Sequence, residues 1–468
     1  MFLLIFLLPI GCAMGPDYVR PELTLPPVSD NASAHIAPFT AADWWKLFND
    51  PTLDRIENEA LIYNRDLKIA MARVDEARAL ARIALADRLP TVGIGADVSR
   101  SRFSQETAIS NRNSTQESFD AFGFASFELD LWGKYRRLNE AARAELLSAK
   151  SSCDAVRLTL TADVAALYFY LRTLETQTRI ARDHLETYEK SCELYRKRYH
   201  AGYIQELDLR RIEADRLATE ALVYRRENAL SQAGTALAML LGRSPRDIVK
   251  GFSEEGKNLE QLSTFPRIPK NIPSDLLSRR PDIRRDEGML IASNARIGAA
   301  RAAFFPSINL TGQYGFISSD LQNLFTDSTN IWNMAGALTQ PIFEGGRFFA
   351  HEKAAKARQK QMLARYEQTV QNAFRETLDA LVACTKITQA FEASLKRAQA
   401  MRRSLALSKK QHAHGHISMI DELDIQRRSL LAELDLSTAR QKQLDTVIAL
   451  CRAMGGGWHE QTGFAPAP

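Results

Sequence analysis

Two long stretches of this chain, residues 134–201 and residues 347–414, contain neither a glycine nor a proline. A continuous helix over either stretch would extend about 100 Å at a rise of about 1.5 Å per residue, several times the average globular helix. Helices of this kind usually belong to coiled coils or helical tubes. Apolar residues such as Leu167, Leu171 and Leu174 recur every three or four positions, which indicates a buried helical seam.

The two long stretches occupy equivalent places in a tandem duplication. A constant offset of 213 in residue number relates three pairs of landmarks: Gly133 with Gly346, Gly202 with Gly415, and Gly242 with Gly455. A fourth pair, Pro90 with Pro306, has the slightly larger offset of 216. Several landmarks rarely share one offset by chance. We therefore expect each half to contain a helix that ends at a proline, two strands, a very long helix, a glycine and another helix.

Each half also contains two segments that alternate apolar and polar residues, as a β-strand does. They are residues 91–99, 119–129, 308–316 and 331–340. Segments of this length suit a tilted transmembrane strand, although a soluble two-sheet domain is the alternative. Four strands cannot close a membrane barrel, and open sheet edges are not tolerated in lipid. If the strands span a membrane, several copies of the chain must share one barrel.

The amino terminus has the pattern of a targeting segment. Residues 2–10 are apolar, and Gly11 and Cys12 follow directly. This arrangement resembles a bacterial lipoprotein cleavage site, which would make residues 1–11 a signal peptide and Cys12 the lipidated first mature residue. Ala13, rather than aspartate, follows the cysteine, which favours sorting to the outer membrane. An ordinary or uncleaved secretory signal is the alternative.

Other classes of function are disfavoured by composition and motifs. The formal net charge of +5 is small for 468 residues, so nucleic-acid binding is not expected. No nucleophile–base signature, P-loop or zinc motif is present, so neither an enzyme nor a metal site is expected. His412 and His416 have a spacing compatible with metal binding, but Gly415 lies between them and favours a polar turn. The remaining cysteines match no metal motif: Cys153, Cys192, Cys384 and Cys451.

A set of short motifs, in one order along the duplicated chain, resembles the TolC-like outer-membrane factor family and its lipoprotein branch. The motifs are GPDYVRPE at 15–22, the Trp44-Trp45 pair, FELDLWGKY at 127–135, LLSRRPDIRRDE at 276–287, ARIGAARAAFFPSINLTG at 295–312 and QPIFEGGR at 340–347. Each motif alone is weak, but the resemblance covers essentially the whole mature chain.

The resemblance implies a mixed α/β membrane protein that forms a homotrimer. A 12-stranded transmembrane β-barrel, with four strands from each chain, would stand on a long α-helical periplasmic tunnel. The family's function is a passive exit duct for drugs, toxic compounds or metal ions. A periplasmic adaptor and an inner-membrane transporter would be the partners, the outer membrane the location, and the lipid on Cys12 the only attached group. A type I secretion duct and a periplasmic adaptor or scaffold are the alternatives.

These patterns also predict the boundaries along the chain. A signal peptide would occupy residues 1–11, a lipidated Pro-rich tether 12–50, the first repeat 51–242, a connection that contributes to an equatorial domain 243–280, the second repeat 281–455 and a C-terminal tail 456–468.

The resemblance places a gate beyond the ends of the long helices. Gly202 and Gly415 would form the tight turns at the periplasmic tip, because glycine readily adopts the left-handed conformation that closes a helix. Asp421 and Asp424 match the family's paired tip acids, which become rings of carboxylates in a trimer and favour cations. Ile420 would form an apolar ring beside them. The alternative is that both acids merely stabilise the first turns of a helix through its dipole.

The resemblance also implies a latch, an ion pair that helps to hold the tip closed, but one of its residues differs in this chain. Asp208 is the first-repeat counterpart of Asp421, since 421 minus 213 is 208. In some family members this acid pairs with a basic residue just after the second tip glycine. Ile417 occupies that position here. Arg210 and Arg211 are the candidates to replace the missing base.

Overall fold

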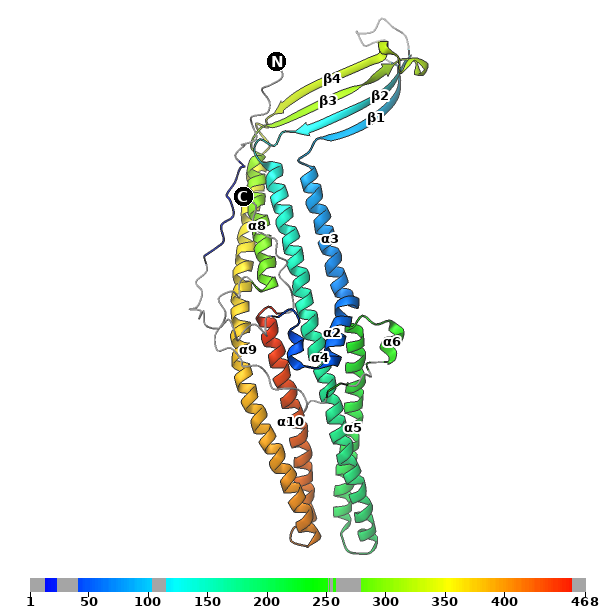
Figure 1. Ribbon diagram of the computed structural model, residues 1–468, viewed down its shortest axis with the longest axis vertical. Helices are drawn as coiled ribbons and strands as arrows, with labels where there is room; N and C mark the ends of the chain where they lie inside the picture. Colours follow the sequence, from blue (N-terminus) through cyan, green and yellow to red (C-terminus); the bar gives the residue numbers. More distant parts are fainter. Residues whose placement is uncertain are drawn as a thin grey trace. The chain divides into compact units, whose positions relative to one another are not determined.

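The computed structural model describes residues 13–22, 41–102, 115–250, 252, 256–257 and 279–456, which are drawn in colour in Figure 1. It contains two compact units. The first comprises Met1–Leu23, Arg73–Ala149 and Arg285–Glu367, and the second comprises Thr24–Ala72, Lys150–Arg284 and Gln368–Pro468.

The described elements repeat in the two halves of the chain. In order they are η2 Trp44–Phe48, α2 Pro51–Tyr63, α3 Arg65–Ala86, β1 Thr91–Arg102, β2 Thr115–Glu128, α4 Lys134–His200, α5 Glu206–Leu240, α6 Pro245–Lys250, α8 Pro281–Ala302, β3 Ser307–Ser318, η4 Leu321–Asn323, η5 Asp327–Thr329, β4 Asn330–Thr339, α9 Arg347–Ala413 and α10 Met419–Ala453. Helices α4 and α9 are both 67 residues long, and α5 and α10 are both 35. The predicted duplication is confirmed.

The glycines related by the repeat offset share one backbone conformation. All have positive φ angles: 75° at Gly133 and 82° at Gly346, 77° at Gly202 and 76° at Gly415, and 70° at Gly242 and 73° at Gly455. Beyond Gly202, the amide of Tyr203 donates to the carbonyl of Arg198, and that of His416 donates in the same way to Gln411. These are the hydrogen bonds of a glycine-terminated helix. They explain why both long helices end where the sequence predicts, to within one residue.

The first unit contains a single antiparallel sheet in the order β1-β2-β3-β4, with the strands side by side in Figure 1. Strand β1 is longer than predicted and β2 begins earlier, because Arg102 pairs with Thr115 at the end of their hairpin. The pairing of β2 with β3 joins the two repeats. The outer strands β1 and β4 carry large exposed apolar residues: Val92, Ile94, Val98, Trp332, Met334 and Leu338. Exposed apolar residues of this kind mark a face that contacts a membrane or another protein chain.

The N-terminal segment 13–22 packs on helices of the same unit. The amide of Met14 donates to the carbonyl of Trp132 at 3.1 Å, and the Arg137 guanidinium contacts Asp17 at 2.7 Å. Further along, Arg20 binds Glu287 of α8 through two hydrogen bonds of 2.8 and 2.5 Å. Cys12, the predicted lipidation site, lies outside the described residues.

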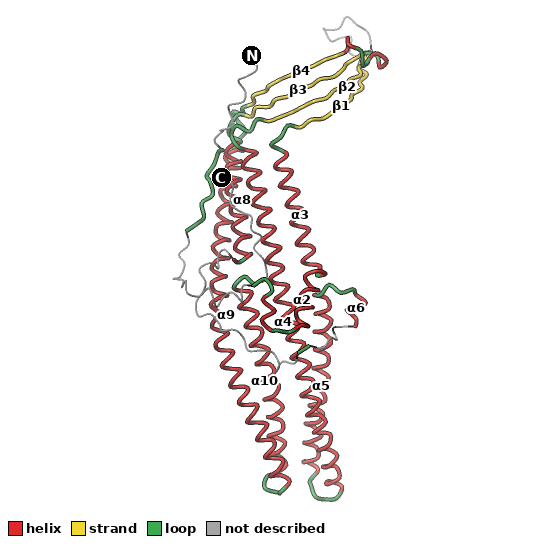
Figure 2. The backbone as a smooth tube through the Cα atoms, in the orientation of Figure 1, coloured by secondary structure: helices red, strands yellow, loops and turns green. Residues whose placement is uncertain are grey.

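The second unit is built on two helical hairpins. Figure 2 shows α4 beside α5 and α9 beside α10, with a short loop at the end of each pair. Their main core includes the predicted seam residues Leu171 and Leu174, each 1% exposed, with Leu167 partly buried beside them. Trp44, Trp45 and Phe48 of η2 complete this core, which accounts for the Trp44-Trp45 motif of the sequence. No helix among the described residues is long and apolar enough to cross a bilayer.

Candidate functional site at the hairpin tips

The predicted tip glycines lie in the loops that end the two hairpins. A Cβ atom added to Gly202 or Gly415 would meet nothing within 4 Å, so the loops have space around them and glycine is needed for its positive φ angle. Helix α5 begins after Gln205, and α10 begins after Ser418. The predicted gate residues therefore stand in the first turns of α10.

Asp421 helps to cap the N-terminus of α10. Its amide binds the Ser418 hydroxyl at 3.2 Å, and its carboxylate accepts from the Ser418 amide at 3.3 Å. This reciprocal arrangement is a capping box. Ile420 precedes it and is 49% exposed. Asp421 therefore stabilises the first turn of α10, which is the alternative role given for it above. A single chain is enough for this role, and the carboxylate remains exposed.

Asp424 is accompanied by two arginines of its own helix. The Arg427 guanidinium donates to one carboxylate oxygen at 2.8 Å, and Arg428 lies 2.6 Å from the other. The hydrogen bond from Arg427 and the charge of Arg428 hold the pKa of Asp424 below its usual range. These bases were not predicted from the sequence, although spacings of three and four residues after an acid indicate such pairs.

The candidate latch residues of the first repeat are placed at the start of α5. Arg210 pairs with Glu206 at 3.1 Å and with Glu213 at 3.0 Å, both on α5. Arg211 is exposed on the same helix. Asp208 lies in the first turn of α5. Burial raises the pKa of Tyr195, and the negative charge of Asp208 adds a smaller increase.

A different set of residues connects the two hairpins near their tips. The Tyr195 hydroxyl of α4 lies 3.1 Å from Nε2 of His412 on α9, and Nδ1 of His412 lies 3.4 Å from the Glu422 carboxylate of α10. Beneath them is an apolar cluster that joins α4, α5 and α10: Tyr188, Cys192, Tyr195, Leu209, Ile212 and Leu423. Because 217 residues separate Tyr195 from His412, no local pattern in the sequence could have paired them.

The histidine cluster has no metal-binding arrangement in the described part of the chain. The rings of His414 and His416 are 6.3 Å apart, and His412 is used in the bridge to Tyr195. Among the described residues no group of three histidine, cysteine, aspartate or glutamate side chains could hold a metal ion.

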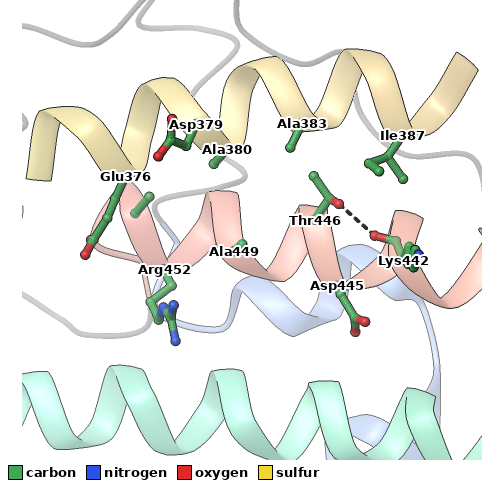
Figure 3. Close-up of a pocket in the computed structure, with 11 residues that line it drawn as sticks. Glu376, Asp379, Ala380, Ala383, Ile387, Lys442, Asp445, Thr446, Ala449 and Arg452 are labelled. Carbon is green, nitrogen blue, oxygen red and sulfur yellow. Dashed lines mark hydrogen bonds between the residues drawn. The ribbon is translucent and has the colours of Figure 1, made fainter. Parts of the chain in front are cut away.

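A pocket of about 430 Å³ lies between α9 and α10, away from the tips. Figure 3 shows alanines of both helices along its floor, with Asp445 and Arg452 projecting to the side of α10 away from α9. One oxygen of Asp445 is buried without a hydrogen-bond partner among the described residues. Burial raises the pKa of Asp445 to about 6, against a smaller opposing effect of Gln441. This carboxylate costs folding energy whenever it is ionised.

Asp445→Asn is therefore expected to stabilise the protein at pH 8 by about 1 kcal/mol, after discounting for water that reaches the partly exposed group. The folded pKa lies above the ordinary value of 3.8, so the penalty is full above about pH 6 and disappears below about pH 4. Thermal unfolding followed by circular dichroism should show a higher Tm at pH 8 and equal Tm values at pH 4. Asp379→Asn, at an exposed rim position of the same pocket, is the matched control and should change little. Equal gains for both variants would contradict the assignment.

The chain is similar to known outer-membrane proteins over nearly its whole length. The model of the family described as "Outer membrane efflux protein" matches residues 57–243 and 272–456. Over 459 residues the chain is 34% identical to the cation efflux system protein CusC of Escherichia coli O6:H1, covering 96% of each protein. It is 35% identical over 463 residues to the outer membrane protein OprJ of Pseudomonas aeruginosa, covering 96% of the chain and 94% of OprJ.

Solved structures agree with these relatives. The CmeC outer membrane channel of Campylobacter jejuni superposes with a TM-score of 0.91 at 26% identity, covering 97% of this chain and 96% of CmeC. A structure of CusC gives a TM-score of 0.84 at 32% identity, covering 95% and 100%. These likenesses confirm the predicted fold class, in which long helices and a four-stranded sheet in each chain build a channel of the kind seen in CmeC and CusC. With family matches in both repeats and relatives along nearly its whole length, the chain belongs to the outer membrane efflux protein family.

Proposed function

We propose that this chain is the outer-membrane channel subunit of a tripartite efflux pump, and that three copies form a passive exit duct. The observation that carries the proposal is the pair of 67-residue helices together with a four-stranded sheet, in a chain that matches efflux channels over nearly its full length. Drugs, toxic compounds or metal ions are the proposed cargo, since relatives are named for cation, toluene and antibiotic efflux.

The proposed partners follow from the mechanics of a duct. A tunnel has no energy source of its own, and the sequence contains no nucleotide-binding P-loop. An inner-membrane transporter would therefore drive export, and a periplasmic adaptor would join it to the tips. Family members are channels and not enzymes, so no catalytic step is assigned to this chain, and no cofactor is proposed besides the lipid on Cys12.

The proposed gate lies in the first turns of α10 of three chains. Ile420 supplies an apolar ring, and Asp421 and Asp424 supply carboxylates. The two arginines that follow Asp424 on its own helix make this neck less acidic than the sequence alone indicated. Gly202 and Gly415 would allow tight turns at the hairpin ends, because glycine adopts the positive φ angle that these turns require.

The proposed latch within each chain is the contact from the Tyr195 hydroxyl of α4 to His412 of α9. It supplies the contact between hairpins that Ile417 cannot make. Asp208, Arg210 and Arg211 remain proposed contributors of charge on the first hairpin, with Arg210 engaged by the acids of its own helix.

Cys12→Ser is expected to abolish incorporation of labelled palmitate and to weaken retention in the outer membrane. The docking of Met14 beside Trp132 supports the proposal, because it holds the described N-terminal segment against the segment that joins β2 to α4. Metabolic labelling followed by membrane fractionation tests it. An unlabelled wild-type protein would contradict lipidation and favour an ordinary secretory signal.

Deletion of the gene in its native host is the test of the proposed function. Loss of the duct should raise intracellular accumulation of exported dyes or metal ions, and a plasmid copy should restore efflux. Unchanged accumulation together with the loss of a secreted protein would instead favour the type I secretion duct.

A further inference from the structure

A largely buried carboxylate stands between the two hairpins. Glu433 of α10 lies 3.1 Å from the guanidinium of Arg402 on α9 and 3.9 Å from Nε2 of His184 on α4. The Ser429 hydroxyl of its own helix donates to it at 3.4 Å. The separation from His184 is too long for a hydrogen bond but suits an ion pair when the imidazole is protonated. One carboxylate therefore connects α10 to α9 and to α4 of the other hairpin.

His184 and Glu433 stand at the same level of the two hairpins. Each lies 18 residues from the tip glycine of its own hairpin, since 202 minus 184 and 433 minus 415 are both 18. Eighteen residues of helix extend about 27 Å. The contact between Tyr195 and His412 lies nearer the tips, so the pair of His184 and Glu433 is separate from that latch.

Apolar clusters flank this pair on both sides along the helices. They contain Ile180, Leu430 and Leu434 on one side and Tyr188, Cys192 and Leu423 on the other. The side chains of His184 and Glu433 are 11% and 15% exposed. Opposite charges that are shielded from water attract each other more strongly than exposed ones. The charge of His184 therefore has a large influence on this contact.

The repeat counterparts of the two residues pair within their own hairpins. At the offset of 213, Glu433 corresponds to Glu220, and His184 corresponds to Arg397. Glu220 pairs with an arginine one turn away on its own helix at 2.9 Å, and Arg397 pairs with Asp435 of its own hairpin at 2.7 Å. A histidine, whose charge depends on pH, thus stands where the second repeat has a permanent cation.

The charged groups that border His184 come from four helices. They are the exposed pair of Arg179 and Asp183 on α4, the pair of Arg182 on α4 with Glu227 on α5, Arg402 on α9 and Glu433 on α10. Burial raises the pKa of Glu433, but His184 and Arg402 outweigh that effect and lower it to about 2. This carboxylate is therefore ionised at physiological pH. Because histidine side chains lose their proton between about pH 5 and pH 8, the attraction is present at acidic pH and is lost as the pH rises.

We propose that Glu433 is a positioning residue of the gate, which holds the first hairpin against the second through a proton-dependent contact with His184. The proposal rests on the duct function proposed above, in which the neck would open as the hairpins separate. At acidic pH the protonated imidazole attracts the carboxylate and opposes separation. At alkaline pH the neutral imidazole no longer does so, whereas Arg402 still holds the carboxylate within the second hairpin.

A double-mutant cycle in the trimer tests the proposal. Single-channel recording gives the open-to-closed ratio at pH 5.5 and pH 8.5 for wild type, His184→Gln, Glu433→Gln and the double variant. At pH 5.5, His184→Gln should raise the ratio about fivefold, as for loss of a partly buried charge pair, but should add nothing to Glu433→Gln. At pH 8.5, His184→Gln should leave the ratio unchanged. The other histidines are present in every variant, so their titration cancels in the cycle.

Two further variants keep the test independent of misfolding. His184→Arg installs the permanent cation that the second repeat has at this position, so it should keep the ratio low at both pH values. Glu220→Gln removes the repeat counterpart of Glu433 and is the matched control, which should behave as wild type. The proposal is overturned if His184→Gln acts equally at both pH values, if the two single effects add at pH 5.5, or if Glu220→Gln acts as strongly as Glu433→Gln.

The same cycle followed by thermal unfolding needs no conduction. Circular dichroism of the four purified trimers should show coupling between His184 and Glu433 in the Tm values at pH 5.5 and none at pH 8.5. This result would support the contact even in a protein that does not conduct, so failure of the duct and failure of the contact are distinguishable. Equal coupling at both pH values, or none at either, would overturn the contact whether or not the protein conducts.

Discussion

Tyr195→Phe is expected to raise the fraction of time that the reconstituted channel spends in its open state. The substitution keeps the ring in the apolar cluster with Leu209 and Leu423 and removes only the hydroxyl that contacts His412. A net contribution of about 1 kcal/mol for one such hydrogen bond corresponds to a factor of about five in the closed-to-open ratio for each chain. The proposed neck is formed by three chains, so the effect on the trimer should be larger. Single-channel recording in planar bilayers measures it.

Tyr203→Phe is the matched control for this experiment. Tyr203 follows the tip glycine and is 82% exposed, so losing its hydroxyl should leave gating unchanged. The latch assignment would be wrong if Tyr195→Phe and Tyr203→Phe gave the same recordings as wild type.

The double variant Asp421→Asn with Asp424→Asn is expected to make the proposed neck selective for anions. Two acids and two neighbouring arginines cancel in each chain, whereas removal of both acids leaves the charges of Arg427 and Arg428 and gives six positive charges in three chains. Rings of one sign favour ions of the opposite sign. The reversal potential under a potassium chloride gradient should therefore shift toward the chloride potential.

The reverse substitution provides the control for selectivity. Arg427→Gln with Arg428→Gln should shift the reversal potential toward potassium, since the carboxylates of Asp421 and Asp424 remain. Asp421→Asn will also weaken the capping box, at a cost of about 1 kcal/mol to α10, so trimer stability must be measured in parallel. Unchanged selectivity in a stable trimer would remove both acids from the gate.

The long helices were predictable because their ends are set locally. A stretch without glycine or proline, closed by a glycine with positive φ, leaves little freedom in where α4 and α9 stop. The strands were less exactly predicted. The extension of β1 to Arg102 depends on the pairing of Arg102 with Thr115. This pairing is a contact between two segments, so the alternation of apolar and polar residues within one segment does not predict it.

The candidate site also has contacts that local spacing predicts and contacts that depend on long-range packing. The arginines that flank Asp424 lie three and four residues from it and could be found from spacing. The bridge from Tyr195 to His412 could not, because it depends on how two hairpins from different repeats pack. The docking of Arg20 on Glu287 of α8 is a further long-range contact of this kind, and the Pro-rich composition around it pointed only to a tether.

Conductance of the purified wild-type protein in a planar lipid bilayer tests the central claim most directly. The account predicts a heat-modifiable trimer that inserts into the bilayer and conducts ions in discrete steps, with the four strands of each chain closing one barrel. A soluble, non-conducting monomer would contradict it and would favour a periplasmic adaptor or scaffold instead.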